Sequence, residues 1–153
     1  MLLCRIRSVI SRIVLWINAG VLLALGVAML VPLALSLLYR DGSWPSLLIP
    51  AVAMIAAGGL SFWFLRPDTR GGEAYVSPRN ILLSVTLAWV LASLIGGTPY
   101  LLEGTFTNPI DSAFEAMSGF TTTGATLLSD IEAESPSILF WRSMTQWLGG
   151  SGA

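Results

Sequence analysis

Three long apolar runs, separated by short polar segments, dominate this chain of 153 residues. They cover residues 13–38, 47–65 and 81–102. A helix of about 20 predominantly apolar residues can cross a bilayer, and each run meets this requirement. The pattern therefore predicts an all-α polytopic membrane protein. We expect Pro32 to kink the first helix and Pro50 to lie in the first turn of the second.

The first run follows a short basic lead, which gives the N-terminus some likeness to a secretory signal peptide. Its apolar core is about twice the ~7–15 residues of such a peptide, and no small-residue cleavage site ends it. We therefore interpret it as a retained membrane helix. Gly20 and Gly26 in this helix, and Gly58 and Gly59 in the second, predict close packing between helices.

A shorter helix is predicted over residues 109–118, after the third run. Asn108 is a favourable N-cap, Pro109 suits the first helical position, and Asp111 favours the positive N-terminal end of the helix. We expect Gly119 to end it. At about 15 Å it would cross half of the ~30 Å hydrocarbon layer. It is either an interfacial helix or a pore helix that enters the membrane and leaves it again.

Residues 119–126, Gly-Phe-Thr-Thr-Thr-Gly-Ala-Thr, follow this half-length helix. Irregular backbone at membrane depth is tolerated only where it lines a cavity or is buried in protein. Backbone carbonyls along such a segment can replace the water shell of an alkali cation. A further helix is expected over residues 136–153. This order favours a helix, a pore helix, a filter strand and a second helix, with an ordinary external loop as the alternative.

The distribution of charge supports a membrane protein and gives it an orientation. Charged residues make up 11% of the chain, under half of the ~25% of an average soluble domain. Arginines gather near the N-terminus and between residues 66 and 79, so the positive-inside rule places both segments in the cytoplasm. Every charge between Arg79 and Arg142 is acidic: Glu103, Asp111, Glu115, Asp130, Glu132 and Glu134. These carboxylates would concentrate cations at a pore mouth, or they reflect only the acidic bias of external loops.

Glu115 is the unusual member of this acidic set. Near the end of the half-length helix its charge would oppose the helix dipole. We hypothesise that it binds amides of the following loop or pairs with Arg142.

Several classes of function are disfavoured by composition. Cys4 is the single cysteine, and the chain has no histidine. This removes an internal disulfide, a cysteine-based zinc site and the commonest general base. No charged residue lies well inside the three runs, so an intramembrane hydrolase is not expected. We predict that the protein is not an enzyme and has no nucleic-acid partner.

Two segments together carry a family resemblance. Residues 114–126, Phe-Glu-Ala-Met-Ser-Gly-Phe-Thr-Thr-Thr-Gly-Ala-Thr, resemble the first pore loop of the Trk/Ktr/HKT superfamily of potassium transporters. Residues 139–150 are similar to the start of the second helix of the same repeat. The two helices ahead of this repeat resemble the TrkH/TrkG type of Trk system potassium uptake protein. The resemblance covers essentially all of the chain, but only the N-terminal part of such a protein.

The resemblance implies potassium uptake through four helix–pore loop–helix repeats in the cell inner membrane, usually with a cytoplasmic nucleotide-binding subunit of the TrkA type. In the matching filter, the backbone carbonyls of Thr122 and Thr123 coordinate the transported K⁺, with Thr121 and Gly124 flanking them. Residues 1–79 would form a leading two-helix region with a cytoplasmic basic loop, and residues 80–153 the first pore repeat. Its parts would be a membrane helix at 81–102, a pore helix at 109–118, a filter at 119–126 and the start of a second helix at 136–153.

One filter strand cannot surround an ion. The remaining carbonyls would come from the missing pore repeats or from a second copy of a full-length homologue, all within the lipid bilayer. We expect the chain not to conduct alone. The alternatives are a non-conducting membrane assembly or binding module, or a truncated relic of a transporter. An intact downstream reading frame with three more threonine–glycine loops would distinguish a partial transporter from a relic.

Overall fold

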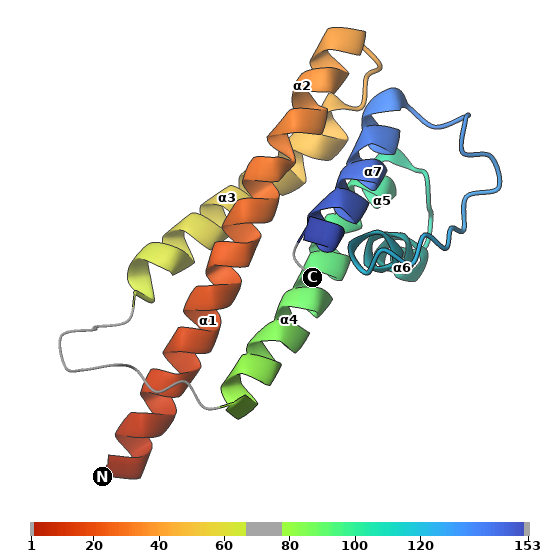
Figure 1. Cartoon of the computed structure of the whole chain (residues 1–153). Coiled ribbons are helices and arrows are strands. Elements are labelled where there is room, and N and C mark those ends of the chain that lie inside the picture. Colours follow the sequence, from red (N-terminus) through yellow and green to blue (C-terminus); the bar gives the residue numbers. More distant parts are fainter. Residues whose placement is uncertain (1, 67–77, 152–153) are drawn as a thin grey trace.

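The computed structural model describes residues 2–66 and 78–151, with side chains from Arg12 onward. Every regular element in these two ranges is a helix, which confirms the all-α fold (Figure 1). Arg70, Gly71 and Gly72, and the side chains of Cys4, Arg5 and Arg7, lie outside the described part. In chain order the helices are α1 (Leu2–Ala28), α2 (Leu30–Tyr39), α3 (Trp44–Phe64), α4 (Pro78–Gly96), α5 (Thr98–Glu103), α6 (Pro109–Phe120) and α7 (Pro136–Ser151).

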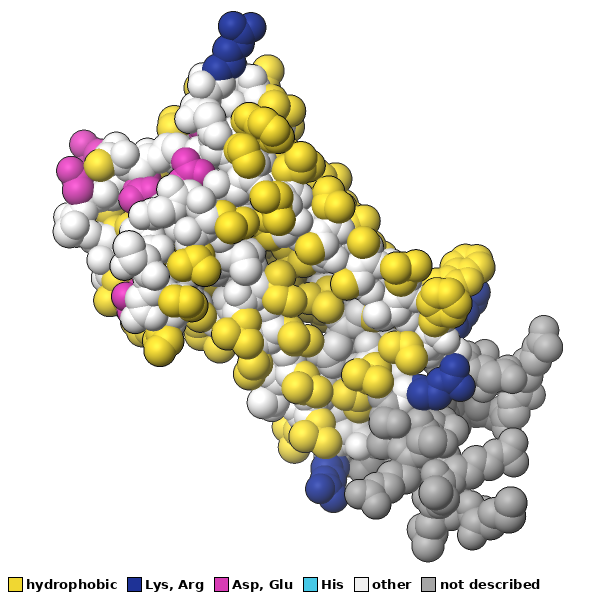
Figure 2. Space-filling model, turned by 180° about the vertical axis from the view of Figure 1, so that it is seen from behind, with side chains coloured by type: hydrophobic (Ala, Val, Ile, Leu, Met, Phe, Trp, Pro, Cys, Tyr) yellow, Lys and Arg dark blue, Asp and Glu magenta, His cyan; other side chains and the backbone are white. Residues whose placement is uncertain are grey.

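Three described segments are long and apolar enough to span a membrane. They are Arg12–Tyr39, Trp44–Phe64 and Pro78–Glu103, with mean hydropathies of 2.6, 2.0 and 2.0. Only 28% of each apolar window is buried within the chain. The remaining apolar side chains form a broad band across the middle of the molecule (Figure 2). Exposing so much apolar surface to water is unfavourable, so the chain is a multi-pass membrane protein.

Proline chemistry explains the break within the first span. Pro32 has no N–H for the carbonyl of Ala28, four residues earlier, and its ring crowds that carbonyl. α1 accordingly ends at Ala28 and α2 begins at Leu30. The N–H of Met29 still binds the Leu25 carbonyl (3.0 Å), so the two helices continue in nearly the same direction (Figure 1). The helix is therefore interrupted one turn before the proline, but the expected kink is slight because its direction changes little.

The third span is broken in the same way by Pro99. α4 ends at Gly96 and α5 begins at Thr98, because Pro99 cannot donate to the carbonyl of Ile95. The Thr98 hydroxyl donates to that carbonyl instead (2.6 Å). A backbone acceptor that the proline would leave unpaired is thus satisfied locally, as a membrane interior requires.

The expected position of Pro50 was wrong. α3 begins at Trp44, earlier than the apolar run suggested, with Pro45 in its first turn. Pro50 therefore lies one turn further inside the helix than expected. The polar loop between the first two spans is correspondingly shorter.

Glycines bring α1 and α3 into close contact. A Cβ on Gly58 would lie 2.7 Å from the backbone nitrogen of Leu23, and one on Gly26 would lie 2.9 Å from the Cβ of Met54. Gly59 has no comparable contact, since its nearest neighbour is a Leu23 side-chain carbon at 3.9 Å. The predicted packing role is confirmed for Gly58 and Gly26, but Gly59 does not share it.

The half-length helix α6 lies across the direction of the long helices, where Figure 1 shows it nearly end-on. It packs against α4 and α7. A Cβ on Gly97 would lie 2.6 Å from the Ser112 carbonyl oxygen, so the α4–α5 junction needs glycine to approach α6. The fully buried Trp141 of α7 donates its indole N–H to the Gly96 carbonyl (2.9 Å). Together these two contacts join α6 and α7 to the end of α4.

Charge separates the two ends of the molecule. We call the end formed by residues 40–43, 103–108 and 128–135 the acidic end, because its carboxylates outnumber its one exposed arginine, Arg40 (Figure 2). The opposite end carries the exposed arginines Arg12, Arg66 and Arg79 and is called the basic end. Arg12 donates to the Phe64 carbonyl there (3.4 Å), which ties α1 to the end of α3.

Candidate functional site

The start of α6 forms as the sequence predicted. Asn108 is the N-cap, and its side-chain oxygen accepts a hydrogen bond from the Ile110 N–H (3.0 Å). Pro109 occupies the first turn, where its missing N–H costs nothing. Asp111 lies in the same turn, near the positive end of the helix dipole. The predicted capping is confirmed.

The end of α6 differs from the prediction. The helix continues through Gly119 to Phe120. A Cβ on Gly119 would overlap the hydroxyl of Thr145 on α7, so this glycine serves helix packing rather than chain reversal. The sequence shows that a glycine is present, but it does not show which of these two uses it serves.

Thr122 reverses the chain instead. It has φ +56°, and the flanking bonds run from the Thr122 N–H to the Gly119 carbonyl (2.9 Å) and from the Thr123 N–H to the Ser118 carbonyl (3.0 Å). These are the two bonds of a Schellman motif, in which glycine ordinarily takes the left-handed position. A β-branched residue is strained in that conformation, and such strain is concentrated at functional sites.

The segment of residues 121–127 is here called the threonine strand. At its start the backbone alternates between left-handed and right-handed conformations. Thr122 and Gly124 have positive φ, and Thr123 between them does not. Within the described residues, the carbonyls of these three accept no hydrogen bond. The neighbouring carbonyls are occupied: Thr121 accepts from the Thr122 hydroxyl (2.7 Å) and Ala125 from the Ser118 hydroxyl (2.6 Å). The strand therefore presents three consecutive free carbonyls.

Glu115 anchors the far part of the threonine strand. It is only 1% exposed. One carboxylate oxygen accepts from the Thr126 hydroxyl (2.9 Å), and the other accepts from the Leu127 N–H (3.0 Å). The hypothesis that Glu115 binds amides of the following loop is confirmed.

Arg142 of α7 neutralises the same carboxylate. Its Nε lies 2.7 Å from Oε1 of Glu115, and its side chain is 17% exposed. Both alternatives proposed for Glu115 therefore hold together. A buried charge needs a partner of this kind, because an unpaired carboxylate is costly in a low-dielectric interior. The pair links α6, the threonine strand and α7.

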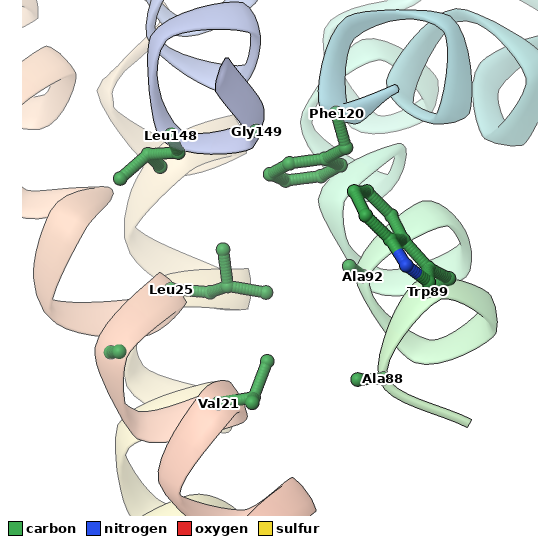
Figure 3. A pocket seen from close by; sticks show the side chains of 9 residues that line it. Val21, Leu25, Ala88, Trp89, Ala92, Phe120, Leu148 and Gly149 are labelled. Atoms are coloured by element: carbon green, nitrogen blue, oxygen red, sulfur yellow. The ribbon is translucent and has the colours of Figure 1, made fainter. Parts of the chain in front are cut away.

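An apolar cavity of about 350 Å³ lies beside the end of α6. Figure 3 shows the Phe120 ring and Trp89 of α4 on one side, facing Val21 and Leu25 of α1 on the other. A Cβ on Gly149 would overlap the Phe120 carbonyl, so close packing is the role of this glycine. The cavity wall is almost entirely hydrocarbon and offers little to coordinate a cation.

A polar cavity of about 510 Å³ lies at the acidic end, and Asp41, Glu103 and Glu134 are among the residues that line it. Glu103 accepts a hydrogen bond from the Ser43 hydroxyl (2.7 Å), and Glu134 accepts one from the Thr105 hydroxyl (2.7 Å). These carboxylates thus join loops that are distant in sequence. Their negative charge also gives this end an electrostatic attraction for cations.

Asp41 is the most tightly held of these carboxylates. Burial alone would raise its pKa, but hydrogen bonds from Ser137, Ser36 and Ser43 outweigh burial and lower it. The backbone N–H of Ser43 donates at 3.1 Å and that of Ser137 at 3.2 Å. Asp41 therefore ties the α2–α3 loop to the start of α7.

These features define a polytopic helical membrane protein in which a half-length helix precedes a glycine–threonine strand. The chain belongs to the TrkH family of cation transport proteins, whose family model matches residues 46–153. An uncharacterized cation transporter of Methanocaldococcus jannaschii is 34% identical over 98% of this chain and 30% of its own length. The Trk system potassium uptake protein TrkH of Halomonas elongata is 32% identical over 92% of this chain and 29% of its own length.

The Escherichia coli K12 protein of the same name is 33% identical over 81% of this chain and 25% of its own length. The chain thus spans between a quarter and a third of these curated relatives. The family recognised from the pore-loop residues is confirmed.

The site also contains residues whose roles the sequence did not indicate. Ser118 binds the strand through its hydroxyl, Thr145 fits against Gly119, and Thr122 carries the chain reversal. No local pattern marks a serine for a partner seven residues away or a threonine for a glycine on another helix. The sequence alone likewise does not show that a threonine takes the positive φ that glycine ordinarily adopts.

Proposed function

We propose that this chain supplies one strand of a potassium-selective filter, with the backbone carbonyls of Thr122 and Thr123 as ligands for K⁺. Thr121 and Gly124 flank them. Potassium as the transported ion is supported by the names of the TrkH relatives, which are potassium uptake proteins. Carbonyl oxygens can replace the hydration shell of K⁺ when several strands surround it.

The observation that carries the proposal is the run of free carbonyls at Thr122, Thr123 and Gly124. In an extended strand, successive carbonyls point to opposite sides. Alternation between left- and right-handed φ turns them toward the same side, which suits coordination of an ion in a narrow path. The strain at Thr122 supports this reading, because an ordinary loop would gain stability from glycine there.

Two further features support a cation at this position. The C-terminal, negative end of the α6 dipole lies where the strand begins. Glu115 holds the strand at Thr126 and Leu127, beyond the free carbonyls, and Arg142 neutralises its charge. The strand is therefore positioned by groups that do not themselves compete for the ion.

The proposed chain has two regions and a defined orientation in the membrane. Residues 1–79 are the leading two-helix region and residues 80–153 the first pore repeat, with the other strands supplied by the rest of a longer transporter. By the positive-inside rule, the basic end lies on the cytoplasmic side of the inner membrane. A cytoplasmic nucleotide-binding subunit of the TrkA type would bind on that side.

A chimera tests the function directly. This chain would replace the matching quarter of the Escherichia coli TrkH protein, in cells that lack their own potassium uptake systems. We expect the chimera to restore growth at low potassium, and Gly124→Ser to abolish it by straining the strand. A chimera that reaches the membrane without restoring uptake would contradict the proposal and favour a non-conducting assembly module.

A further inference from the structure

We infer that Ser118 is a positioning residue that determines which carbonyls of the threonine strand face the ion, an inference that rests on the proposed function. Ser118 lies in the last turn of α6 and is 5% exposed. Its effect is exerted through the backbone of the strand.

Ser118 contacts the threonine strand through both its backbone and its side chain. Its carbonyl oxygen accepts from the N–H groups of Thr123 (3.0 Å) and Gly124 (3.4 Å). Its hydroxyl donates to the carbonyl of Ala125 (2.6 Å). Ser118 thus stabilises the chain reversal at the start of the strand through its carbonyl. Its hydroxyl also binds the Ala125 carbonyl, which directly follows the three free carbonyls.

The hydroxyl bond sets the length of the carbonyl series. The Ala125 carbonyl cannot turn toward a cation without breaking its bond to Ser118, which would weaken cation binding there about fivefold. The series available to an ion therefore ends at Gly124. Because selectivity depends on the number and field strength of the coordinating carbonyls, Ser118 contributes to the choice between K⁺ and Na⁺.

The first arm of the test measures uptake of Rb⁺ and Na⁺ by the chimera. We expect Ser118→Ala to lower the Rb⁺/Na⁺ uptake ratio about three- to tenfold, because Ala125 is released. Ser112→Ala is the matched control. Ser112 is also a buried serine of α6, but its hydroxyl bonds only the Asn108 carbonyl of its own helix (3.4 Å). The control should keep the ratio at a similar amount of protein in the membrane.

The second arm uses the 153-residue chain in lipid bilayers, with a ¹³C-labelled carbonyl at Ala125. A hydrogen bond lowers the stretching frequency of a carbonyl, so Ser118→Ala should move the labelled infrared band to higher frequency. An unmoved band would overturn the contact. A moved band with an unchanged uptake ratio would overturn the positioning role. If the unsubstituted chimera takes up no Rb⁺, the proposed function fails and the selectivity role of Ser118 fails with it, whereas the infrared arm still decides the contact.

Discussion

Removal of the Glu115 carboxylate is the sharpest test of how the threonine strand is held. Glu115→Ala would leave Arg142 without its partner and leave the Thr126 hydroxyl and Leu127 N–H without their acceptor. Breaking a buried pair on one side costs about 3–5 kcal/mol. Glu115→Gln keeps one acceptor oxygen and loses the charge, so we expect about 1.5–3 kcal/mol.

The free energy of unfolding of the chain in bicelles measures this loss. Glu132→Gln is the control, since Glu132 is an exposed carboxylate of the acidic end, and it should change stability by less than about 0.5 kcal/mol. If Glu115→Gln were no more destabilising than the control, the anchoring role of Glu115 would be refuted.

The double reversal Glu115→Arg with Arg142→Glu separates the two functions of the carboxylate. It restores opposite charges on α6 and α7, so part of the stability should return. Arginine has no acceptor for the Leu127 N–H or the Thr126 hydroxyl, so uptake by the chimera should stay low. Full recovery of uptake would show that charge pairing alone is sufficient.

Three further outcomes are expected. Gly149→Ala should destabilise the chain by about 3 kcal/mol in thermal unfolding, because the new methyl overlaps the Phe120 carbonyl, whereas Gly150→Ala should be tolerated since its nearest contact is at 3.5 Å. Thr122→Gly should raise the free energy of unfolding by about 1 kcal/mol by relieving the left-handed strain, yet reduce ion selectivity. The pKa of Asp41 is lowered in the folded chain, so its charged form adds to the free energy of unfolding in full above the ordinary pKa of an aspartate. This stabilisation is lost as the pH falls through the lower pKa of the folded state, and Asp41→Asn should reduce the loss of stability at acidic pH.

The sequence was sufficient to predict elements whose signals are local. The three apolar spans and the capped start of α6 at Asn108 depend on neighbouring residues, and both predictions are confirmed. Pro32 also interrupts the first span, with only a slight change of direction. The Glu115 contacts could be anticipated because a carboxylate at a helix C-terminus needs an explanation.

The other details depend on tertiary packing. Gly119 matched the pattern of a helix stop, but the approach of Thr145 from α7 gives it another purpose. Once Gly119 is helical, the reversal moves to Thr122, and the strain there is offset by the two closing hydrogen bonds. The approach of one helix to another decides such choices, and no local sequence signal carries that information.

The central claim is that the carbonyls of Thr122 and Thr123 are ligands for the transported ion. Anomalous X-ray scattering from Rb⁺ in crystals of the chimera tests it most directly, since Rb⁺ substitutes for K⁺ and its position is located without reference to the protein. We predict a peak bordered by these two carbonyls, reduced in Gly124→Ser. A peak bordered only by the carboxylates of the acidic end, with none beside the threonine strand, would contradict the account.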